Sequence, residues 1–269
     1  SAKFNVPYEE ALVLCKGTKD KPAEPLWKER RQGAKEFSFQ RAYGAGAEKI
    51  AATTGMSVEE VKSLIVMEEK LYPEIVKFNE EVERTVKKNR RPTSRYVQHP
   101  DAPGITLQLG IGGYRTPDGQ LFMFQESPSP KFMLDRGIVQ GFSPPEIKNY
   151  PTQGTGSTWM KAAMWLAVRE FYFYKNWGGL GLLINTVHDA MYADTSPEVT
   201  SKAAQVVHAC MLEASTLVEH TFGWEIEVPV PSETTGGPNM ASEDSIKGIQ
   251  DGMQAVRQAL RQRYIKSHT

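Results

Sequence analysis

Apolar residues recur at intervals of three and four residues along much of this chain, a spacing that is typical of amphipathic helices. The predicted helices cover residues 7–14, 26–43, 57–88, 154–175 and 196–222. Ser57 and Glu60 predict the start of the third helix, because a serine hydroxyl and a glutamate three residues later can satisfy each other's free backbone amides. Pro73 predicts a kink or a boundary inside that helix.

Elsewhere the apolar pattern shortens to the period of extended strands. The predicted strands cover residues 105–109, 120–125, 180–187, 190–193 and 225–230. The first two are separated by Thr116-Pro-Asp-Gly119, a strong turn signal, and therefore predict a β-hairpin. The next two join tightly around His188 and Asp189. Helices combined with short hairpins predict an α+β fold.

Composition restricts the compartment and the partners that we expect for the protein, but it does not identify an activity. The chain carries 32 basic and 32 acidic residues, which argues against nonspecific basic coating of a nucleic acid. The charge is nevertheless uneven, because residues 84–95 contain several basic residues and no acid. With two distant cysteines and no apolar run approaching the roughly 20 residues that span a bilayer, we expect a soluble protein of the reducing cytoplasm, without a membrane partner.

One predicted helix carries the most specific chemical pattern in the chain. Arg31, Lys35, Phe39 and Tyr43 are spaced four residues apart, and Gly44 follows. On a helix this spacing forms one narrow stripe. Two cations suit a polyanion and two aromatic rings suit a stackable base, so the stripe favours a nucleoside triphosphate as ligand. The alternative is that the rings pack in a core and the cations lie on a solvated face.

Residues 30–44, RRQGAKEFSFQRAYG, resemble motif B on the O helix of the fingers in family A (polymerase-I-type) DNA polymerases. The resemblance implies that Arg31 and Lys35 bind the triphosphate and act in catalysis. It also implies that Phe39 packs on the incoming sugar and base. Tyr43, with the glycine that follows it, would contact DNA at the templating-base position.

His188 and Asp189 resemble motif C of the same family, a His-Asp turn in the palm. The resemblance implies that Asp189 is catalytic and binds a divalent metal ion, for which a hard carboxylate oxygen suits Mg²⁺, and that His188 contacts the primer end. The next position usually carries another acid and here is Ala190, whose missing role Asp194 could take. By itself the pair could be a solvated hairpin tip, although its apolar flanks predict a place where burial of charge is costly.

Asn149 and Gln153 are four residues apart and lie between these two motifs. The family has an Asn and a Gln at this spacing, which implies that both amides contact primer–template DNA in the minor groove, where acceptors common to all base pairs allow sequence-independent checking. Pro145 stands where the family often has a basic residue, which leaves one template contact unassigned. Asn149 could instead cap the following helix.

Motif A, which supplies a second catalytic carboxylate in this family, has no counterpart in the chain. Two metal ions held about 3.5–4 Å apart need more than one carboxylate. We therefore expect the C-terminal part of a DNA-directed DNA polymerase that is inactive as the isolated chain and needs a complementary N-terminal fragment with the thumb and motif A. That fragment would be a separate chain, a part removed from the polypeptide, or the other half of an intein-split precursor.

The motif order predicts a right-hand polymerase with helical fingers, a β-hairpin and part of an antiparallel palm sheet. Residues 1–140 would form the fingers, with the nucleotide-binding helix at about 26–43, and residues 141–235 the C-terminal part of the palm. Its ligands would be primer–template DNA, dNTP and two Mg²⁺ ions, and compact loops favour a bacteriophage enzyme. The alternatives are a noncatalytic nucleic-acid-binding remnant of a polymerase and a structural protein with accidental motif matches.

Residues 236–269 would form a linker and a C-terminal amphipathic helix, because Gly236-Gly237-Pro238 is typical of a linker. The apolar positions of that helix are Ile246, Ile249, Met253, Val256 and Leu260. Packing on the palm is its simplest role. Its basic residues could instead contact DNA or a partner, and they are Arg257, Arg261, Arg263 and Lys266.

Overall fold

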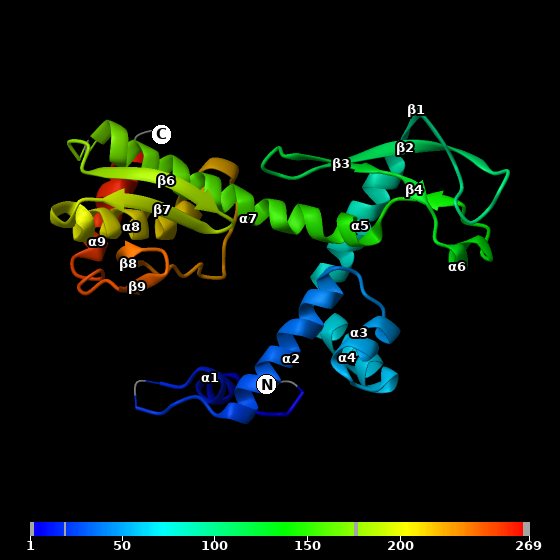
Figure 1. Ribbon diagram of the computed structural model, residues 1–269, viewed down its shortest axis with the longest axis horizontal. Helices are drawn as coiled ribbons and strands as arrows, with labels where there is room; N and C mark the ends of the chain where they lie inside the picture. Colours follow the sequence, from blue (N-terminus) through cyan, green and yellow to red (C-terminus); the bar gives the residue numbers. More distant parts are fainter. Residues whose placement is uncertain (1–2, 19, 175–176, 266–269) are drawn as a thin grey trace. The chain divides into compact units, whose positions relative to one another are not determined.

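The computed structural model describes residues 3–18, 20–174 and 177–265. The chain forms two compact units, Ser1–Pro151 and Thr152–Thr269. The division falls within helix α7, which spans Pro144–Val168 (Figure 1). Lys175, the predicted end of a helix, and Lys266, a predicted contact residue, lie outside the described residues.

The first part of unit 1 is helical. Its helices are α1 (Tyr8–Lys16), α2 (Pro25–Ala42), α3 (Ala47–Thr54), α4 (Val58–Leu71) and α5 (Pro73–Lys88). Ser57 caps α4 as predicted, since its hydroxyl accepts a hydrogen bond from the backbone N–H of Glu60 at 3.1 Å. Pro73 begins α5, which confirms the predicted boundary, because proline at a first helical position loses no helical hydrogen bond.

A three-stranded antiparallel sheet follows, with strand order β1-β2-β3. The strands are β1 (Arg91–Gln98), β2 (Thr106–Arg115) and β3 (Leu121–Gln125). A hairpin with the predicted turn is confirmed, and the turn is closed by a 2.9 Å hydrogen bond from the N–H of Gly119 to the carbonyl of Thr116. The predicted first strand is wrong in its bounds, because residues 111–115 of β2 pair with β3, whereas residues 106–108 pair with β1. Helix α5 packs closely on this sheet, because a Cβ at Gly112 would collide with the carbonyl oxygen of Val86.

The buried carboxylate of Glu126 ties this sheet to the end of α5. Both of its oxygens accept hydrogen bonds from Arg90 at 2.8 Å, and the N–H of Gly110 donates to it at 2.6 Å. Burial raises the pKa of Glu126, but the hydrogen bonds from Arg90 and Gly110 outweigh burial, so its pKa lies below the usual range. Beyond Glu126 the proline-rich stretch forms β4 (Ser127–Pro128), α6 (Lys131–Leu134) and β5 (Gln140–Gly141).

Helix α7 begins ten residues earlier than the predicted start at residue 154, so that expectation is wrong. Pro151 lies inside the helix, although proline lacks a backbone N–H and disfavours the helix interior. Tertiary packing overrides this local preference. Ile147 is buried against Val82, Val86 and Phe124, and the ring of Tyr150 stacks on Phe124 with centroids 6.0 Å apart.

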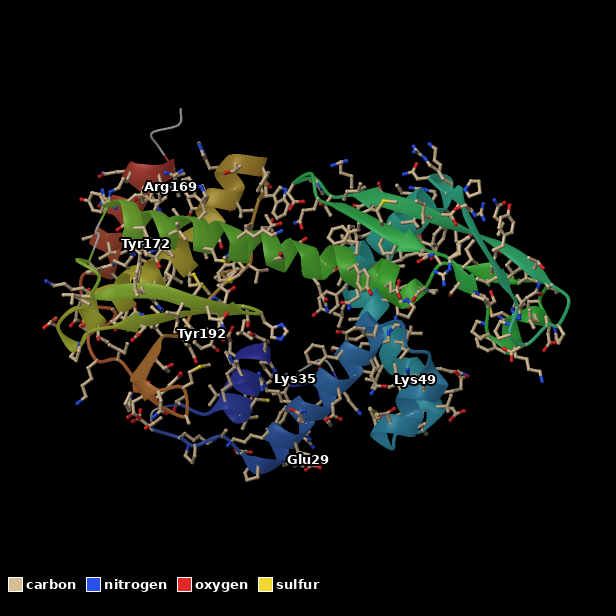
Figure 2. All side chains as sticks on the ribbon, turned by 45° about the horizontal axis from the view of Figure 1, so that its top comes forward. Glu29, Lys35, Lys49, Arg169, Tyr172 and Tyr192 are labelled. Atoms are coloured by element: carbon tan, nitrogen blue, oxygen red, sulfur yellow. The ribbon has the colours of Figure 1, made fainter. Side chains whose placement is uncertain are left out.

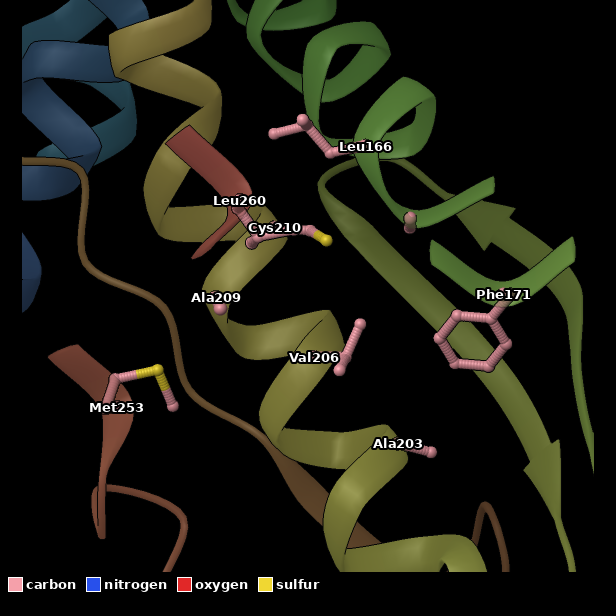
Figure 3. Close-up of a cluster of buried hydrophobic side chains, with 9 residues drawn as sticks. Leu166, Phe171, Ala203, Val206, Ala209, Cys210, Met253 and Leu260 are labelled. Carbon is pink, nitrogen blue, oxygen red and sulfur yellow. The ribbon is translucent and has the colours of Figure 1, made fainter. Parts of the chain in front are cut away.

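Unit 2 is built on the hairpin β6 (Gly181–Val187) and β7 (Ala190–Thr195) and on helix α8 (Pro197–Phe222), all three as predicted. Its main core joins the C-terminal part of α7 to α8 and the chain's last helices (Figure 3). The buried residues of this core are Leu166, Ala167, Phe171, Ala203, Val206, Ala209, Cys210, Met253 and Leu260. No helix among the described residues is long and apolar enough to cross a membrane.

Two predictions between α8 and the last helix are wrong. Residues 225–230 are not a strand, because the sheet formed by β6 and β7 has only these two strands and offers that segment no pairing partner among the described residues. The expected linker at 236–238 lies in a further hairpin, β8 (Thr235–Asn239) with β9 (Ser242–Ser245). Gly237 serves close approach there rather than flexibility, since a Cβ would collide with the carbonyl oxygen of Ser242.

The C-terminal amphipathic helix exists but is shorter than predicted, because Ile246 and Ile249 precede its start. It consists of α9 (Met253–Leu260) continued by a π-helical turn, η2 (Arg261–Ile265). Arg257 and Arg261 each bind the fully buried carboxylate of Glu213 at 2.5 Å. Arg263 binds the buried carboxylate of Glu170. These arginines are engaged inside unit 2, which favours the packing role over contact with DNA.

The C-terminal helix is expected to stabilise unit 2 through Leu260, which keeps only 1% of its surface exposed. Leu260→Ala should lower the free energy of unfolding by about 2–5 kcal/mol, the usual cost of a cavity left by a buried leucine. Gln262→Ala, at an exposed position in the next turn, is the matched control. Urea denaturation followed by circular dichroism measures both, and equal stability of the two variants would contradict a core role for this helix.

Candidate functional site

Helix α2 presents the predicted stripe to solvent. Arg31 and Lys35 are exposed, while Phe39 keeps 60% and Tyr43 51% of its surface exposed. Tyr43 is the C-cap residue, so the stripe runs to the end of the helix. Figure 2 labels Lys35 on α2. The exposure of both rings contradicts the alternative in which they pack in a core.

The other side of α2 is fixed to α3 and α4 by an apolar cluster. Phe37 is 8% exposed and packs with Ile50, which is fully buried, and with Val61. Positions two residues apart differ by roughly 200° around a helix, so burial of Phe37 directs Phe39 away from this cluster. The cluster therefore holds the helix while leaving the stripe accessible.

Ion pairing separates the cations of α2 into two classes. Arg30 stacks over the ring of Phe4 at 3.9 Å, and Arg41 binds Glu68 at 2.8 Å and Glu69 at 3.0 Å. Arg31 and Lys35 have no ion-pair or hydrogen-bond partner in the part of the chain that the structure describes. Lys28 of α2 is likewise exposed without an ion-pair partner among the described residues, but Arg31 and Lys35 are the two unpaired cations that lie on the stripe with the rings and are available there to an external polyanion.

Gly44 lets the chain turn sharply after the stripe. Its φ of +74° lies in the left-handed region, which favours glycine. A Cβ at this position would also lie 3.4 Å from Cγ of Pro145, at the start of α7. A larger residue would thus strain the backbone directly beside Tyr43, and this local constraint was not evident from the motif.

In unit 2 the tip of the β6–β7 hairpin carries His188 and Asp189. Val187 pairs with Ala190, so these two residues form the complete turn. Both side chains are exposed, and the expectation that the apolar flanks would place them at a site of costly burial is wrong. His188 adopts a φ of +54°, which is uncommon outside glycine and strains a residue that has a Cβ.

The hairpin register separates Asp194 from Asp189. Asp194 pairs with Leu182 near the far end of β7 and lies four residues along the strand from Ala190, a distance of about 13 Å. It cannot share a metal ion with Asp189, so the suggested replacement of the acid at Ala190 is wrong. Within residues 3–18, 20–174 and 177–265, no cluster of three or more His, Cys, Asp or Glu side chains could hold a metal ion.

Asp189 nevertheless fits one position in a Mg²⁺ coordination shell. Its carboxylate is a hard oxygen ligand on an exposed turn, and it has no ion-pair partner among the described residues. Mg²⁺ in phosphoryl-transfer sites is commonly held by one or two carboxylates together with substrate phosphates and water. The turn can therefore contribute one carboxylate, and any second one must come from elsewhere.

The two predicted amides lie on α7 on either side of the division between the units. Asn149 is buried and Gln153 is exposed. Because α7 begins at Pro144, Asn149 occupies the second turn, and the alternative in which it caps the helix is wrong. Thr158, five residues after Gln153, donates a hydrogen bond from its hydroxyl to the carbonyl of Gly154 at 3.3 Å.

A cavity of about 340 Å³ in unit 2 lies apart from every predicted motif residue. It is lined by Glu170, Trp177, Lys202, Gln205, Val206, Ala255, Val256, Ala259 and Arg263. Glu170 accepts hydrogen bonds from Arg263 and, at 2.9 Å, from the hydroxyl of Tyr264. Burial and this hydrogen bond raise the pKa of Tyr264 to about 12. The carboxylate is thus committed to holding the C-terminal helix.

Comparison with known proteins gives a family for this arrangement. The model of DNA polymerase family A matches residues 14–242. A DNA polymerase of Mycobacterium phage D29 is 33% identical over 72 residues, which are 27% of this chain and 11% of that protein. The matched stretch is thus a small part of the phage protein.

Proposed function

The chain belongs to DNA polymerase family A, whose model matches residues 14–242, and from this we propose that it functions as part of a DNA polymerase. Its function would be template-directed addition of dNMP to a primer 3′ end, as part of a DNA-directed DNA polymerase acting in the cytoplasm of a bacterium or a phage-infected cell. The observation that carries this proposal is the exposed stripe on α2, in which two uncommitted cations precede two exposed aromatic rings.

Residues 1–140, which lie in unit 1, would act as the fingers. Arg31 and Lys35 would bind the triphosphate and stabilise the charge that develops as pyrophosphate leaves. Phe39 would pack on the sugar and base of the incoming nucleotide. Tyr43, followed by Gly44, would contact DNA at the templating-base position. Burial of Phe37 and the ion pairs of Arg41 support this role, because they hold the helix that carries the stripe.

Residues 141–235, which include the end of unit 1 and most of unit 2, would belong to the palm. Asp189 would be one ligand of catalytic Mg²⁺, and His188 would contact the primer end. When bound, Mg²⁺ neutralises charge on the transferring phosphate. The two-residue turn supports this role, because it projects both side chains from the end of a hairpin into solvent. Gln153, which is exposed on α7, would contact primer–template DNA in the minor groove, whereas Asn149 is buried and would have to become accessible to join it.

A second catalytic carboxylate would come from a complementary fragment that also carries the thumb. Two Mg²⁺ ions about 3.5–4 Å apart need more than Asp189, and Asp194 lies too far along β7 to contribute. The competing function is a noncatalytic nucleic-acid-binding remnant of a polymerase. The stripe favours the catalytic role, because Arg31, Lys35, Phe39 and Tyr43 match motif B residue by residue and in order, and that motif binds a nucleoside triphosphate.

Primer extension with a labelled primer–template tests this proposal. The purified chain alone is expected to add no nucleotide, because two Mg²⁺ ions need a second carboxylate and Asp194 lies too far from Asp189 to supply it. Mixing it with the thumb and motif A portion of a family A polymerase should produce dNTP-dependent extension. Extension by the chain alone would contradict the need for a fragment, and no extension in any mixture that forms a complex would favour the noncatalytic alternative.

A further inference from the structure

Exposed cations gather where α5 ends and the edge strand β1 begins. The basic strip consists of Arg84 and Lys88 on α5 and Arg91 and Arg95 on β1. All four side chains are exposed, and none has an ion-pair partner among the described residues. The chain as a whole has a formal charge of zero, so this local excess of positive charge favours binding of an anionic ligand at this place.

Two other cations of the same segment, unlike the strip residues, are neutralised by acidic side chains. Lys87 binds Glu83 at 2.6 Å, and Arg90 forms a two-pronged ion pair with the buried Glu126. Those two charges serve the fold, whereas the strip residues between and beyond them remain free. On α5, Glu80 and Glu81 lie about one turn before Arg84, so the positive surface begins at Arg84 and extends toward β1.

The spacing of the strip suits a charged backbone. Arg84 and Lys88 are one helical turn apart, about 6 Å along the axis, and Arg91 and Arg95 are separated by up to about 13 Å of strand. Tyr96 follows directly on β1 and keeps 61% of its surface exposed. An exposed ring on the same strand as exposed cations can add base stacking to phosphate pairing, which is how proteins bind unpaired nucleotides.

Two structural roles explain only part of the strip. Lys88 lies in the last turn of α5 and there interacts favourably with the helix dipole. Charges on β1, an edge strand, also discourage pairing between molecules. Neither role accounts for the exposed Tyr96 beside Arg95, nor for Arg84, which lies more than a turn from the helix end.

We propose that the basic strip, with Tyr96, binds the phosphate backbone of single-stranded DNA, as the unpaired template strand of a polymerase would present it. This inference rests on the proposed function for the identity of the nucleic acid, and it adds a contact surface outside the motif residues. Binding is electrostatic, so the affinity falls with salt in proportion to the number of phosphates that the cations neutralise.

Fluorescence anisotropy of the full chain with a labelled 20-nucleotide oligo-dT tests the strip. Arg91→Gln/Arg95→Gln should reduce the slope of log K against log salt concentration by about 1.4, at about 0.7 per lost single-strand phosphate contact. Lys49→Gln/Lys62→Gln, which removes two exposed lysines of α3 and α4, should leave the slope unchanged. Equal slopes for the two double variants would overturn the proposal.

Further measurements separate the competing explanations. Tyr96→Ala should weaken oligo-dT binding with little change in slope, and a loss that is equal for duplex DNA would overturn the single-strand assignment. Self-association of the Arg91→Gln/Arg95→Gln variant, with an unchanged DNA slope, would assign these charges to edge protection instead. Oligo-dT binding is measured without nucleotide addition, so the two proposals can fail separately. If the double arginine variant shows the expected loss of slope but no mixture extends a primer, only the polymerase proposal is refuted.

Discussion

Asp189→Asn is expected to abolish primer extension by the reconstituted polymerase while leaving its affinity for primer–template DNA nearly unchanged. The substitution keeps the size of the side chain but removes the anionic oxygen that would bind Mg²⁺. Losing about 4 kcal/mol of transition-state stabilisation lowers kcat by about a thousandfold, since each 1.36 kcal/mol is a factor of about ten. Folding should be unaffected, because the side chain is exposed on a two-residue turn.

Asp194→Asn provides the matched control for this experiment. Asp194 is an exposed acid on the same hairpin, yet it lies about 13 Å along the strand from the turn. Single-turnover extension at saturating dNTP should be close to that of the unmodified chain. If Asp189→Asn kept near-normal turnover, or if both variants lost activity equally, Asp189 would not be a metal ligand.

Elements with strong local signals could be predicted from the sequence. The capping residue Ser57 begins α4, and Pro73 divides α4 from α5, because each acts through backbone groups in its own turn. The two hairpins around residues 116–119 and 188–189 were predicted for the same reason. Short-range chemistry decides these features, whatever the rest of the chain does.

Features that depend on distant partners could not be predicted. The start of α7 required knowing that Ile147 and Tyr150 pack on residues of α5 and β3, which outweighs the local effect of Pro151. The segment 225–230 has a strand-like composition but no strand beside it. Gly237 looked like a linker residue because the close approach of Ser242 is not visible in one segment alone.

The candidate site divides in the same way. The spacing of the stripe on α2 predicted which residues share a face, and their exposure agrees with that. It could not predict that Arg41 is neutralised by Glu68 and Glu69, which lie on another helix. Whether a cation of α2 is neutralised within the fold or stays unpaired is therefore decided by tertiary structure, and Arg31 and Lys35 are the unpaired cations of the stripe among the described residues.

Removing either free cation of the stripe is expected to lower kcat/KM for dNTP in the reconstituted polymerase by about two to three orders of magnitude. Arg31→Ala and Lys35→Ala each delete a contact that strengthens as charge develops on the leaving pyrophosphate, a loss of about 3–4 kcal/mol. Both side chains are exposed and unpaired among the described residues, so neither substitution leaves a buried acid behind. Unfolding free energies should change by less than about 0.5 kcal/mol.

Lys49→Ala tests whether any lysine of unit 1 would have the same effect. Lys49, labelled in Figure 2 together with Lys35, is exposed on α3. Like Lys35, it has no ion-pair partner in the described part of the chain. Pre-steady-state incorporation should then separate binding from chemistry: a cation that acts only in the ground state changes KM, whereas one that acts in the transition state lowers kcat as well. A fall in kcat for Lys35→Ala, with Lys49→Ala unchanged, is the result expected of a stripe that holds the triphosphate during transfer. If both variants had an equally small effect, Lys35 would have no role in nucleotide binding and would be an ordinary solvated residue of the helix.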